Sequence, residues 1–453
     1  MPKNAIKTET VANGDPISRV HGQNIPLCLS LADFEQKSGS MLSRPMGPPY
    51  AAVFLQIADI RRLIAVAGLA KADEFIDYIK KALQQAFSSP LEISCPFSLG
   101  SFLLLAPHDD SLPKRLQDLR ALIKSAAPFR YLKLKCGLYP IKANEDLPVH
   151  KIFERAEHCC KSVLKDKRRH LAVFDHETAH ELELRHHIRE YFLEAMGSGE
   201  LSIALQPIVA TSDGNVDYCE ALARWNDKKY GYIPPRLFVD VLEKSGMIHK
   251  LDLFTAKKAC SLAAHIFERS GKWPHFSVNL SRLDFEACDI EAELESILKE
   301  TGVPTSSVCI EITETMLSND EKRFKKILCA FKEKGHELWI DDFGSGFSSF
   351  NVLKDYDFDV IKLDLRFFER FLTNVKSSKI IASVIRMAKD LGVKALAEGI
   401  EIQECVEFLK KEKCDLIQGF FVSKPLPSSG ISDIFMGTST PLSVIKAQAL
   451  LKA

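Results

Sequence analysis

The second half of the chain carries polar side chains on a series of short apolar runs, mostly at or near their carboxyl ends, in a pattern that suits metal chemistry. These residues are Glu220, Asn279, Glu311, Asp341, Asp342, Lys362, Asp364, Glu398 and Gln418. If the runs are neighbouring strands, the side chains meet at one edge of a sheet or barrel. Converging carboxylates repel one another unless cations neutralise them, and such oxygen ligands suit Mg²⁺ or Mn²⁺. An adjacent pair such as Asp341 and Asp342 can bridge two metals, a common device for phosphodiester hydrolysis.

A plainer interpretation is that these residues are solvated turn residues. For one acidic residue at a strand end that interpretation usually holds, because strand ends and loops lie at the surface. It does not readily explain six or more such positions on the same side of successive strands. We therefore favour a functional site.

The runs themselves predict the elements that position these side chains. The eight predicted strands are 202–209, 216–223, 276–280, 308–313, 338–343, 360–364, 393–398 and 416–420, and helical patterns separate them from the second strand onward. This alternation fits a (β/α)8 barrel, a modified TIM barrel within an α/β fold. The connection between the first two strands, residues 210–216, is too short for a parallel crossover, so we expect an antiparallel first strand.

The preceding residues predict a separate α/β domain. We expect a flexible segment over residues 1–45, a domain of mixed strands and helices over 46–175, and the barrel domain over 176–453. Strands are predicted at 51–58, in the hairpin 97–106 and at 130–140, with a helix over about 149–165. Asp175 can cap a helix that starts at His176 and ends near Gly197 and Gly199.

Composition excludes several classes of protein. Lys+Arg and Asp+Glu both number 60, so the formal net charge is zero, which argues against a protein that binds DNA or RNA polymers through bulk charge. No run approaches the roughly 18 apolar residues of a membrane span, and the first residues lack the apolar core of a signal peptide. The twelve cysteines show no CxxC spacing. We expect a cytoplasmic protein with reduced thiols and no membrane insertion.

Over about residues 181–428 the sequence resembles the EAL domain of cyclic-di-GMP phosphodiesterases. The motifs that carry the resemblance are LQPIV (205–209), EALARW (220–225), VNLS (278–281), EITE (311–314), DDFGSGFSS (341–349), IKLD (361–364), AEGIE (397–401) and QGFFVSKPL (418–426). Each motif alone is weak, but their order and spacing are very specific. The family fold is a modified TIM barrel with an antiparallel first strand, in agreement with the short connection.

The resemblance implies a role for each matching residue. It implies a first metal ion held by Glu220, Asn279, Glu311 and Asp341, and a second held by Asp341, Asp342 and Glu398. Lys362 would position or help deprotonate the attacking water, and Gln418 would support a phosphate or the metal cage. Glu314 and Glu401 would order the loop 343–349. Contacts to the dinucleotide would come from Gln206, Leu222 and Arg224. The product would be linear pGpG, and a homodimer through this domain is implied.

The chain departs from the EAL family after its Arg-Trp pair. Family members often carry His-Pro there, whereas this chain has Asn226, Asp227 and Lys228. The change affects a loop on the substrate side rather than the metal ligands. We therefore expect it to alter affinity more than chemistry.

Residues 50–175 resemble a GGDEF, or diguanylate cyclase, domain in outline only. The signature hairpin reads Ser98-Leu99-Gly100-Ser101-Phe102, and Gln56 or Ala58 stands where a metal-binding aspartate belongs, with Asp59 one residue away. Ile64-Ala65 replaces the base-recognising Asn-Asp pair. Without carboxylates nothing holds Mg²⁺ and GTP, so we predict no cyclase activity. A regulatory or dimerising module is favoured over an inert scaffold, although fold alone does not decide.

His176-Glu177-Thr178-Ala179-His180 matches the HExxH motif of zinc proteases, and His187 falls eleven residues after His176. The extended zinc motif requires glycine at position 183, where this chain has Glu183. Short motifs match often by chance, and we disfavour a zinc site.

Two further hypotheses stay open beside hydrolysis of cyclic di-GMP. The barrel could be a non-catalytic cyclic-di-GMP receptor that signals to an unidentified protein partner, or it could hydrolyse another phosphodiester. Receptors of this kind often lose a metal ligand, and none is lost here, which ranks hydrolysis first.

Overall fold

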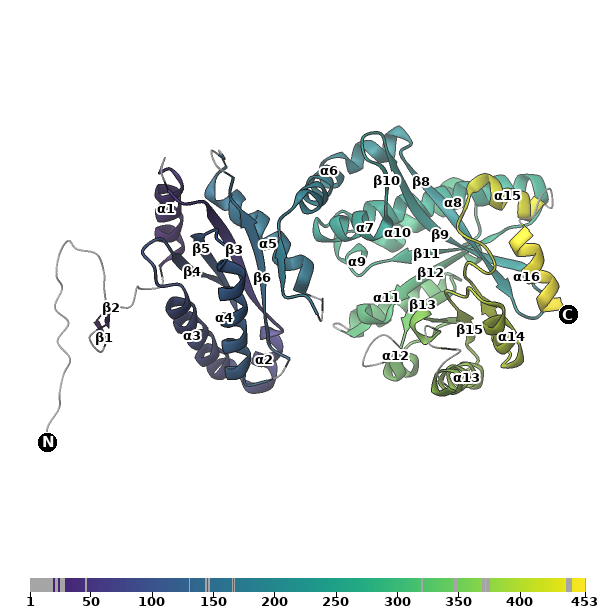
Figure 1. Cartoon of the computed structure of the whole chain (residues 1–453). Coiled ribbons are helices and arrows are strands. Elements are labelled where there is room, and N and C mark those ends of the chain that lie inside the picture. Colours follow the sequence, from purple (N-terminus) through teal and green to yellow (C-terminus); the bar gives the residue numbers. More distant parts are fainter. Residues whose placement is uncertain are drawn as a thin grey trace. The chain divides into compact units, whose positions relative to one another are not determined.

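The computed structural model describes residues 19–20, 23–24, 29–44, 47–129, 131–142, 145, 147–164, 166, 168–318, 321–344, 349–368, 371, 375–436 and 442–452. The chain divides into two compact units, Met1–Glu183 and Leu184–Ala453 (Figure 1). The division falls within helix α6 (His176–Ser198), whose first turn is capped by Asp175: its Oδ1 accepts from the backbone N of Thr178 at 2.8 Å. Each unit is considered by itself.

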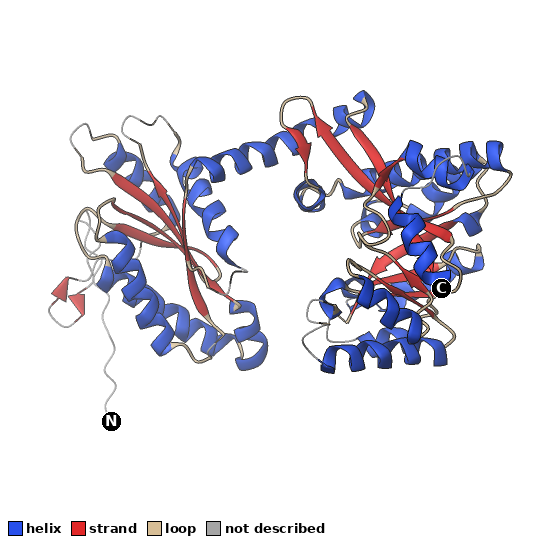
Figure 2. Ribbon diagram, turned by 45° about the vertical axis from the view of Figure 1, so that its right-hand side comes forward, coloured by secondary structure: helices blue, strands red, loops and turns tan. Residues whose placement is uncertain are grey.

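The first unit is a five-stranded sheet with helices on both faces (Figure 2). In spatial order its strands are β4 (Ile93–Ser98), β5 (Ser101–Pro107), β3 (Tyr50–Ala58), β6 (Lys133–Pro140) and β7 (Leu171–Val173). Helices α2 (Ile60–Ala67), α3 (Leu69–Ala86) and α4 (Leu112–Ala126) share a core with one face, and α1 (Leu31–Leu42) and α5 (Val149–Leu164) with the other. Both faces of β3 are therefore buried, which explains its continuous apolar run.

Helix α1 contradicts the expectation that residues 1–45 form a flexible segment, as far as residues 31–42 are concerned. Phe34 is fully buried and packs edge-on against Phe153 at 5.2 Å between ring centroids. Ser30 caps the helix by accepting a hydrogen bond from the backbone N of Asp33. The helix is stabilised by the packing of its apolar face. The polar composition of residues 1–45 as a whole does not indicate that face. Upstream, β1 (Arg19–Val20) and β2 (Gln23–Asn24) pair antiparallel, while 1–18, 21–22, 25–28 and 45 lie outside the described residues.

The second unit is the predicted barrel. Its strands are β8 (Leu201–Ala210), β9 (Val216–Asp227), β10 (Gly231–Ile233), β11 (His275–Leu280), β12 (Val308–Thr313), β13 (Leu338–Phe343), β14 (Val360–Leu363), β15 (Lys394–Ala397), β16 (Leu416–Ile417) and β17 (Leu426–Pro427). From β9 to β16 the barrel strands pair parallel, and β8 closes the ring antiparallel to both β9 and β16. The antiparallel first strand is confirmed.

Helices cover the outside of the barrel (Figure 1). They are α7 (Pro235–Lys244), α8 (Ile248–Ser270), α9 (Asp284–Ala287), α10 (Ile290–Thr301), α11 (Glu321–Glu333), α12 (Ser349–Asp355), α13 (Val375–Asp390), α14 (Gln403–Lys411), α15 (Ser428–Met436) and α16 (Leu442–Lys452), with 3-10 turns at Thr305–Ser307, Glu314–Ser318 and Leu365–Phe367. The largest core lies between strands and helices. Within the part of the chain that the structure describes, no helix is both long and apolar enough to cross a bilayer.

Two layers of side chains fill the barrel interior. The lower layer is an apolar cluster of Ile208, Ala210, Tyr218, Cys309, Trp339, Val360, Leu396 and Leu416. Because successive side chains alternate between the two faces of a strand, the residue two positions further along points inward again. For six strands that next residue is polar: Glu220, Glu311, Asp341, Lys362, Glu398 and Gln418. A polar layer therefore lies above an apolar plug, at the carboxyl ends of the parallel strands.

Candidate active site

Strand register places the predicted site residues at one level of the barrel. Gln206 on β8 lies opposite Glu220 on β9, and Asn279 on β11 lies opposite Glu311 on β12. The Asn279 amide nitrogen donates to Glu220 Oε1 at 3.0 Å, so the side chains of β9 and β11 are in contact. The structure thus brings together residues separated by up to 212 positions in the chain, as the barrel prediction requires.

A bulge in β13 explains how two adjacent aspartates reach this level. Ile340 pairs with Ile361 and Phe343 with Leu363, so Asp341 and Asp342 both lie opposite the single residue Lys362. Asp342 adopts a left-handed backbone conformation with φ of 54°, which side chains other than glycine seldom take. Its backbone N donates to Asp341 Oδ1 at 2.8 Å. In a regular strand the two carboxylates would face opposite sides, and the bulge re-aims the second one.

Lys362 is the centre of the polar layer. Its side chain is 1% exposed, and its Nζ lies 2.6 Å from Glu311 Oε2, 2.7 Å from Glu398 Oε1, 3.4 Å from Asp341 Oδ1 and 3.8 Å from Glu220 Oε1. Burial by itself lowers the pKa of this ammonium, but the surrounding carboxylates more than reverse that effect, and its pKa lies well above the ordinary value. Lys362 is therefore held charged.

One ammonium does not neutralise the carboxylates around it. Burial, only partly offset by Lys362, raises the pKa of both Glu311 and Glu398 to about 8. Glu311 Oε1 is buried and accepts no hydrogen bond from the described residues. Buried acids that hold their protons above neutral pH, together with an unused carboxylate oxygen, fit a divalent cation that would replace those protons and be bound by oxygen ligands. The donor set of this layer is consistent with the Mg²⁺ or Mn²⁺ expected from the sequence.

The carboxylates gather around the ammonium of Lys362 rather than in a ligand shell of their own. Among the described residues, no three His, Cys, Asp or Glu side chains already stand in an arrangement that would hold a metal ion.

Gln418 and Gln206 form a hydrogen-bond chain at the wall of the barrel. Gln418 Nε2 donates to Glu220 Oε2 at 2.6 Å and to Gln206 Oε1 at 3.2 Å. The Gln206 amide in turn donates to the backbone carbonyl of Ser423 at 3.2 Å. These hydrogen bonds fix the orientation of Glu220, and Gln418 is in direct contact with this predicted metal ligand.

Sequence reasoning missed the partner of the second aspartate. Asp342 shares a hydrogen bond with Asp364, and burial together with that bond raises the pKa of Asp342 to about 6. Arg366 donates to Asp364 at 2.5 Å and lies 4.0 Å from Asp342, and its hydrogen bonds lower the pKa of Asp364 to about 2. The DLR sequence (364–366) after β14 is the only signal that could have indicated this pairing.

A cavity of about 720 Å³ adjoins the polar layer. Its lining includes Leu222, Arg224 and Asn279, which brings the predicted dinucleotide contacts Leu222 and Arg224 next to a predicted metal ligand. Arg224 Nη1 donates to the backbone carbonyl of Ala223 at 2.8 Å. The same wall contains Asp252, whose carboxyl is hydrogen-bonded to that of Asp284. The sequence analysis did not identify this buried acid pair.

The two residues predicted to order the loop 343–349 differ in placement. Glu314 Oε2 accepts a hydrogen bond from the backbone N of Gly344 at 3.3 Å, at the start of that loop. Glu401 is exposed, and no described residue forms a hydrogen bond or ion pair with it. Residues 345–348 lie outside the described residues, so the loop itself is not placed.

The disfavoured zinc motif does not assemble with His187. His176 and His180 are exposed on the first turns of α6. His187 Nε2 instead lies 2.6 Å from Asp227 Oδ2, and its ring stacks on Tyr191 at 4.4 Å. Asp227 Oδ1 accepts from the backbone N of Lys229 and of Tyr230, both at 2.8 Å. The residue that departs from the His-Pro pattern thus closes a turn and anchors α6.

The hairpin of the first unit is built without acidic residues. β4 and β5 are joined at Ser98–Ser101, where the two hydroxyls lie 2.5 Å apart and Gly100 takes a φ of 71°. A Cβ at Gly100 would lie 3.2 Å from the side chain of Ile60, so glycine permits the close approach.

Comparison with known proteins identifies the barrel. The EAL domain family matches residues 189–425, more than half of the chain. "Oxygen sensor protein DosP" of Escherichia coli (strain K12) is 31% identical over 251 residues, covering 55% of this chain and 31% of that protein. "Cyclic di-GMP phosphodiesterase NbdA" of Pseudomonas aeruginosa is 25% identical over 406 residues, covering 86% of this chain and 50% of that protein. This chain thus spans about a third to a half of the length of these relatives.

Solved structures agree with that match. The structure described as "PaMucR Phosphodiesterase, c-di-GMP complex" is similar with a TM-score of 0.52 and 27% identity, over 54% of this chain and 99% of that chain. The structure described as "Vibrio cholerae LapD S helix-GGDEF-EAL (bound to c-di-GMP)" has a TM-score of 0.59 at 16% identity, over 86% of this chain and 93% of that chain. The latter is a likeness of fold alone, and it extends into the first unit. With the matched barrel and its reversed first strand, the chain belongs to the EAL domain family.

Proposed function

We propose that this protein hydrolyses cyclic di-GMP to linear pGpG. The observation that carries the proposal is the arrangement of four carboxylates within 4.0 Å of the buried ammonium of Lys362, beside a cavity lined by Leu222 and Arg224. A relative named as a cyclic di-GMP phosphodiesterase, and a similar phosphodiesterase structure described as a complex with that dinucleotide, support the choice of substrate.

Two divalent ions, Mg²⁺ or Mn²⁺, fit this donor set. Glu220, Asn279, Glu311 and Asp341 would hold one ion, and Asp341, Asp342 and Glu398 the other. When bound, such ions stabilise negative charge on the phosphate and lower the pKa of a coordinated water. The bulge that turns Asp341 and Asp342 toward the same side suits a shared ligand between two ions.

The side chains of the chain itself have separate tasks. Lys362 holds the attacking water by hydrogen bonding and offsets the charge that develops at phosphorus, because its ammonium stays protonated. Glu398 lies 2.7 Å from that ammonium and can take up the proton that the water loses. Gln418 keeps Glu220 oriented. Arg224 and Leu222 bind the dinucleotide from the adjoining cavity.

The test is a turnover assay on the purified full chain. Cyclic di-GMP with Mg²⁺, and separately with Mn²⁺, should give pGpG, separated by ion-exchange chromatography, and Glu220→Ala should abolish product formation. An exposed acid on the same unit, Glu300→Ala, is the matched control and should retain activity. Binding of cyclic di-GMP without product under either metal would instead support the receptor alternative. Product from other cyclic dinucleotides alone would indicate a different substrate.

We propose a regulatory or dimerising role for the first unit. The serine and apolar residues of its hairpin offer no carboxylate to a metal and GTP. Incubation with GTP and Mg²⁺ should give no cyclic di-GMP, and light scattering should show a dimer of the full chain. Formation of cyclic di-GMP would contradict the first expectation, and a monomer at micromolar concentration the second.

A further inference from the structure

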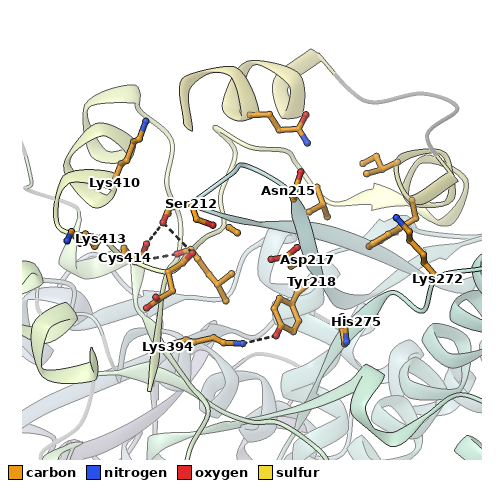
Figure 3. Close-up of a pocket in the computed structure, with 18 of the residues that line it drawn as sticks. Ser212, Asn215, Asp217, Tyr218, Lys272, His275, Lys394, Lys410, Lys413 and Cys414 are labelled. Carbon is orange, nitrogen blue, oxygen red and sulfur yellow. Dashed lines mark hydrogen bonds between the residues drawn. The ribbon is translucent and has the colours of Figure 1, made fainter. Parts of the chain in front are cut away.

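A second cavity lies at the opposite end of the barrel from the polar layer. Its volume is about 1120 Å³, and it is bounded by the loops that precede the parallel strands (Figure 3). The side chains around it include Tyr218 near the start of β9, His275 at the start of β11 and Lys394 at the start of β15. Helix α16 contributes Gln448. This volume is somewhat above the roughly 300–1,000 Å³ of common small-ligand sites, so the cavity has room for a small organic ligand.

The lining of this cavity is strongly basic. The charged side chains are Lys272, Lys389, Lys394, Lys410 and Lys413, against Asp217 and Asp415. Five lysines against two aspartates leave three positive charges on one wall of a chain whose total charge is zero. Figure 3 labels four of these lysines, Lys272, Lys394, Lys410 and Lys413, among the residues that line the cavity. A concave wall of one charge sign attracts small ions of the opposite sign.

Most of the lining lysines are not neutralised by acidic side chains of the described residues. Within the described ranges, no acidic side chain forms an ion pair with Lys272, Lys389 or Lys413. Asp415, one of the two aspartates of the lining, is engaged by the backbone instead: one of its carboxylate oxygens accepts a hydrogen bond from the backbone N of Ala395 at 2.9 Å. Lys394 is partly neutralised, since it lies 3.6 Å from Glu337 and donates to the Tyr218 hydroxyl at 3.0 Å.

Helix ends provide an alternative reason for lysines at this face. Lys389 lies in the last turn of α13, Lys410 in the last turn of α14, and Lys272 just follows α8. Each helix carboxyl end carries about half a negative charge, so three ends offset about half of the three surplus positive charges, and Glu337, 3.6 Å from Lys394, offsets part of the rest. The cavity therefore remains positive after this correction.

The cavity is also lined by aromatic and neutral polar side chains, which suit the uncharged part of a ligand. Tyr218, Trp273 and His275 supply aromatic surface, and the Tyr218 and His275 rings lie 5.3 Å apart between centroids. Asn215 and Ser212 supply neutral polar groups. Lysine ammonium groups bind phosphate oxygens as point charges, and aromatic side chains pack on an organic portion.

We propose that this basal cavity binds a small organic anion that bears phosphate groups. It is a site apart from the dinucleotide cavity, because the apolar plug around Trp339 fills the barrel between them. The proposal is independent of hydrolysis at the other end of the barrel: it requires only that the barrel is folded.

The experiment uses inorganic pyrophosphate as the probe and the full chain in EDTA at constant ionic strength. Without metal, the carboxylates at the far end repel the probe, so calorimetry reports the basal cavity. We expect saturable binding that weakens at least tenfold in the double variant Lys272→Gln/Lys413→Gln. The double variant Lys299→Gln/Lys326→Gln removes the same charge from exposed positions on α10 and α11, and should bind as the unmodified chain does. Circular dichroism confirms that each variant is folded.

Three outcomes would overturn the proposal. They are the absence of saturable binding at millimolar pyrophosphate, equal weakening in both double variants, and binding to vesicles of anionic lipid without binding to pyrophosphate. The first two results would leave the lysines as partners of helix ends, and the third would make the face a membrane-surface contact.

Discussion

Lys362 Nζ and Glu311 Oε2 lie 2.6 Å apart at the centre of the barrel, where both side chains are almost completely buried. Neither group could be buried alone, since an isolated charge in a protein interior is strongly unfavourable. The lysine thus has a structural task in addition to its proposed chemical one.

Lys362→Met keeps the volume of the side chain and removes its charge. We expect turnover to fall by about 10²-fold or more, because a positioned proton-handling group contributes that much. In EDTA the free energy of unfolding of the barrel should fall by about 3–5 kcal/mol, the usual effect of leaving a buried charge without its partner. Tryptophan fluorescence measures this, since Trp225, Trp273 and Trp339 all belong to the second unit.

Saturating Mn²⁺ should restore part of that stability while turnover stays low. Lys257→Met is the control, because Lys257 forms an exposed ion pair with Glu300 at 2.8 Å and should lose less than about 1 kcal/mol. A Lys362→Met variant of unchanged stability in EDTA would contradict the structural task.

Gln418→Leu removes the amide that holds Glu220 at 2.6 Å. Groups that orient a metal ligand typically contribute 10–100-fold to metal affinity. We therefore expect the Mn²⁺ concentration for half-maximal activity to rise by about that factor, while activity at saturating metal recovers in part. Gln403→Leu is the control: its amide donates to Glu407 at 2.8 Å on the exposed surface of α14. Equal metal requirements in the two variants would refute the orienting role.

Asp342→Gly tests the bulge. Glycine adopts a φ of 54° without strain, so this variant should be at least as stable as the unmodified chain, whereas Asp342→Ala should be about 1 kcal/mol less stable than Asp342→Gly. Both variants lose a proposed metal ligand and should lose activity. Lys413→Gly is the matched control, since Lys413 has a φ of 57° far from the polar layer. It should gain stability and keep full activity, as measured by denaturant unfolding and turnover.

The buried acid pair at the cavity of about 720 Å³ predicts a pH dependence. Burial raises the pKa of Asp284 to about 6 and that of its partner Asp252 further, so the folded barrel binds protons that the unfolded chain releases. The pair's contribution to stability is complete below about pH 4 and falls as pH rises through 6, by about 2–3 kcal/mol.

Asp252→Asn should remove the part of this dependence that comes from Asp252, while the buried Asp284 keeps its own part. The difference in unfolding free energy between variant and unmodified chain should therefore shift in favour of the variant from pH 4 to pH 7, as measured by tryptophan fluorescence in urea. A difference that is constant over this range would show that the two carboxyl groups do not share a proton.

The barrel was predictable because two local features of the sequence indicate its strands. Short apolar runs such as 308–313, separated by helical patterns, indicate parallel strands, and the seven-residue connection 210–216 excludes a parallel first pair. Polar residues at or near the carboxyl ends of these runs predicted that Glu220, Glu311 and Lys362 meet at one edge. The physical constraint in each case is local, so a single sequence contains it.

Other features depend on register and packing that the sequence does not encode locally. The bulge at Asp341 and Asp342 is a shift between two strands, and it becomes visible only when Ile340 and Phe343 have partners. Helix α1 has a polar composition, and its stability comes from packing on α5 and the sheet. The basal lysines are scattered over 142 positions from Lys272 to Lys413, and only barrel closure gathers them.

The reversal of β8 changes where the preceding chain joins the barrel. Leu201 at its start pairs with Trp225, beyond Glu220 on β9, and Ala210 at its end pairs with Leu416 at the base. In an all-parallel barrel the chain would arrive at the base. Here the carboxyl end of α6 is joined directly to the rim that carries the polar layer. Because α6 also packs on Trp225 of β9 and on Phe238 of α7, the chain enters the barrel at a point held by both β8 and the elements beside it.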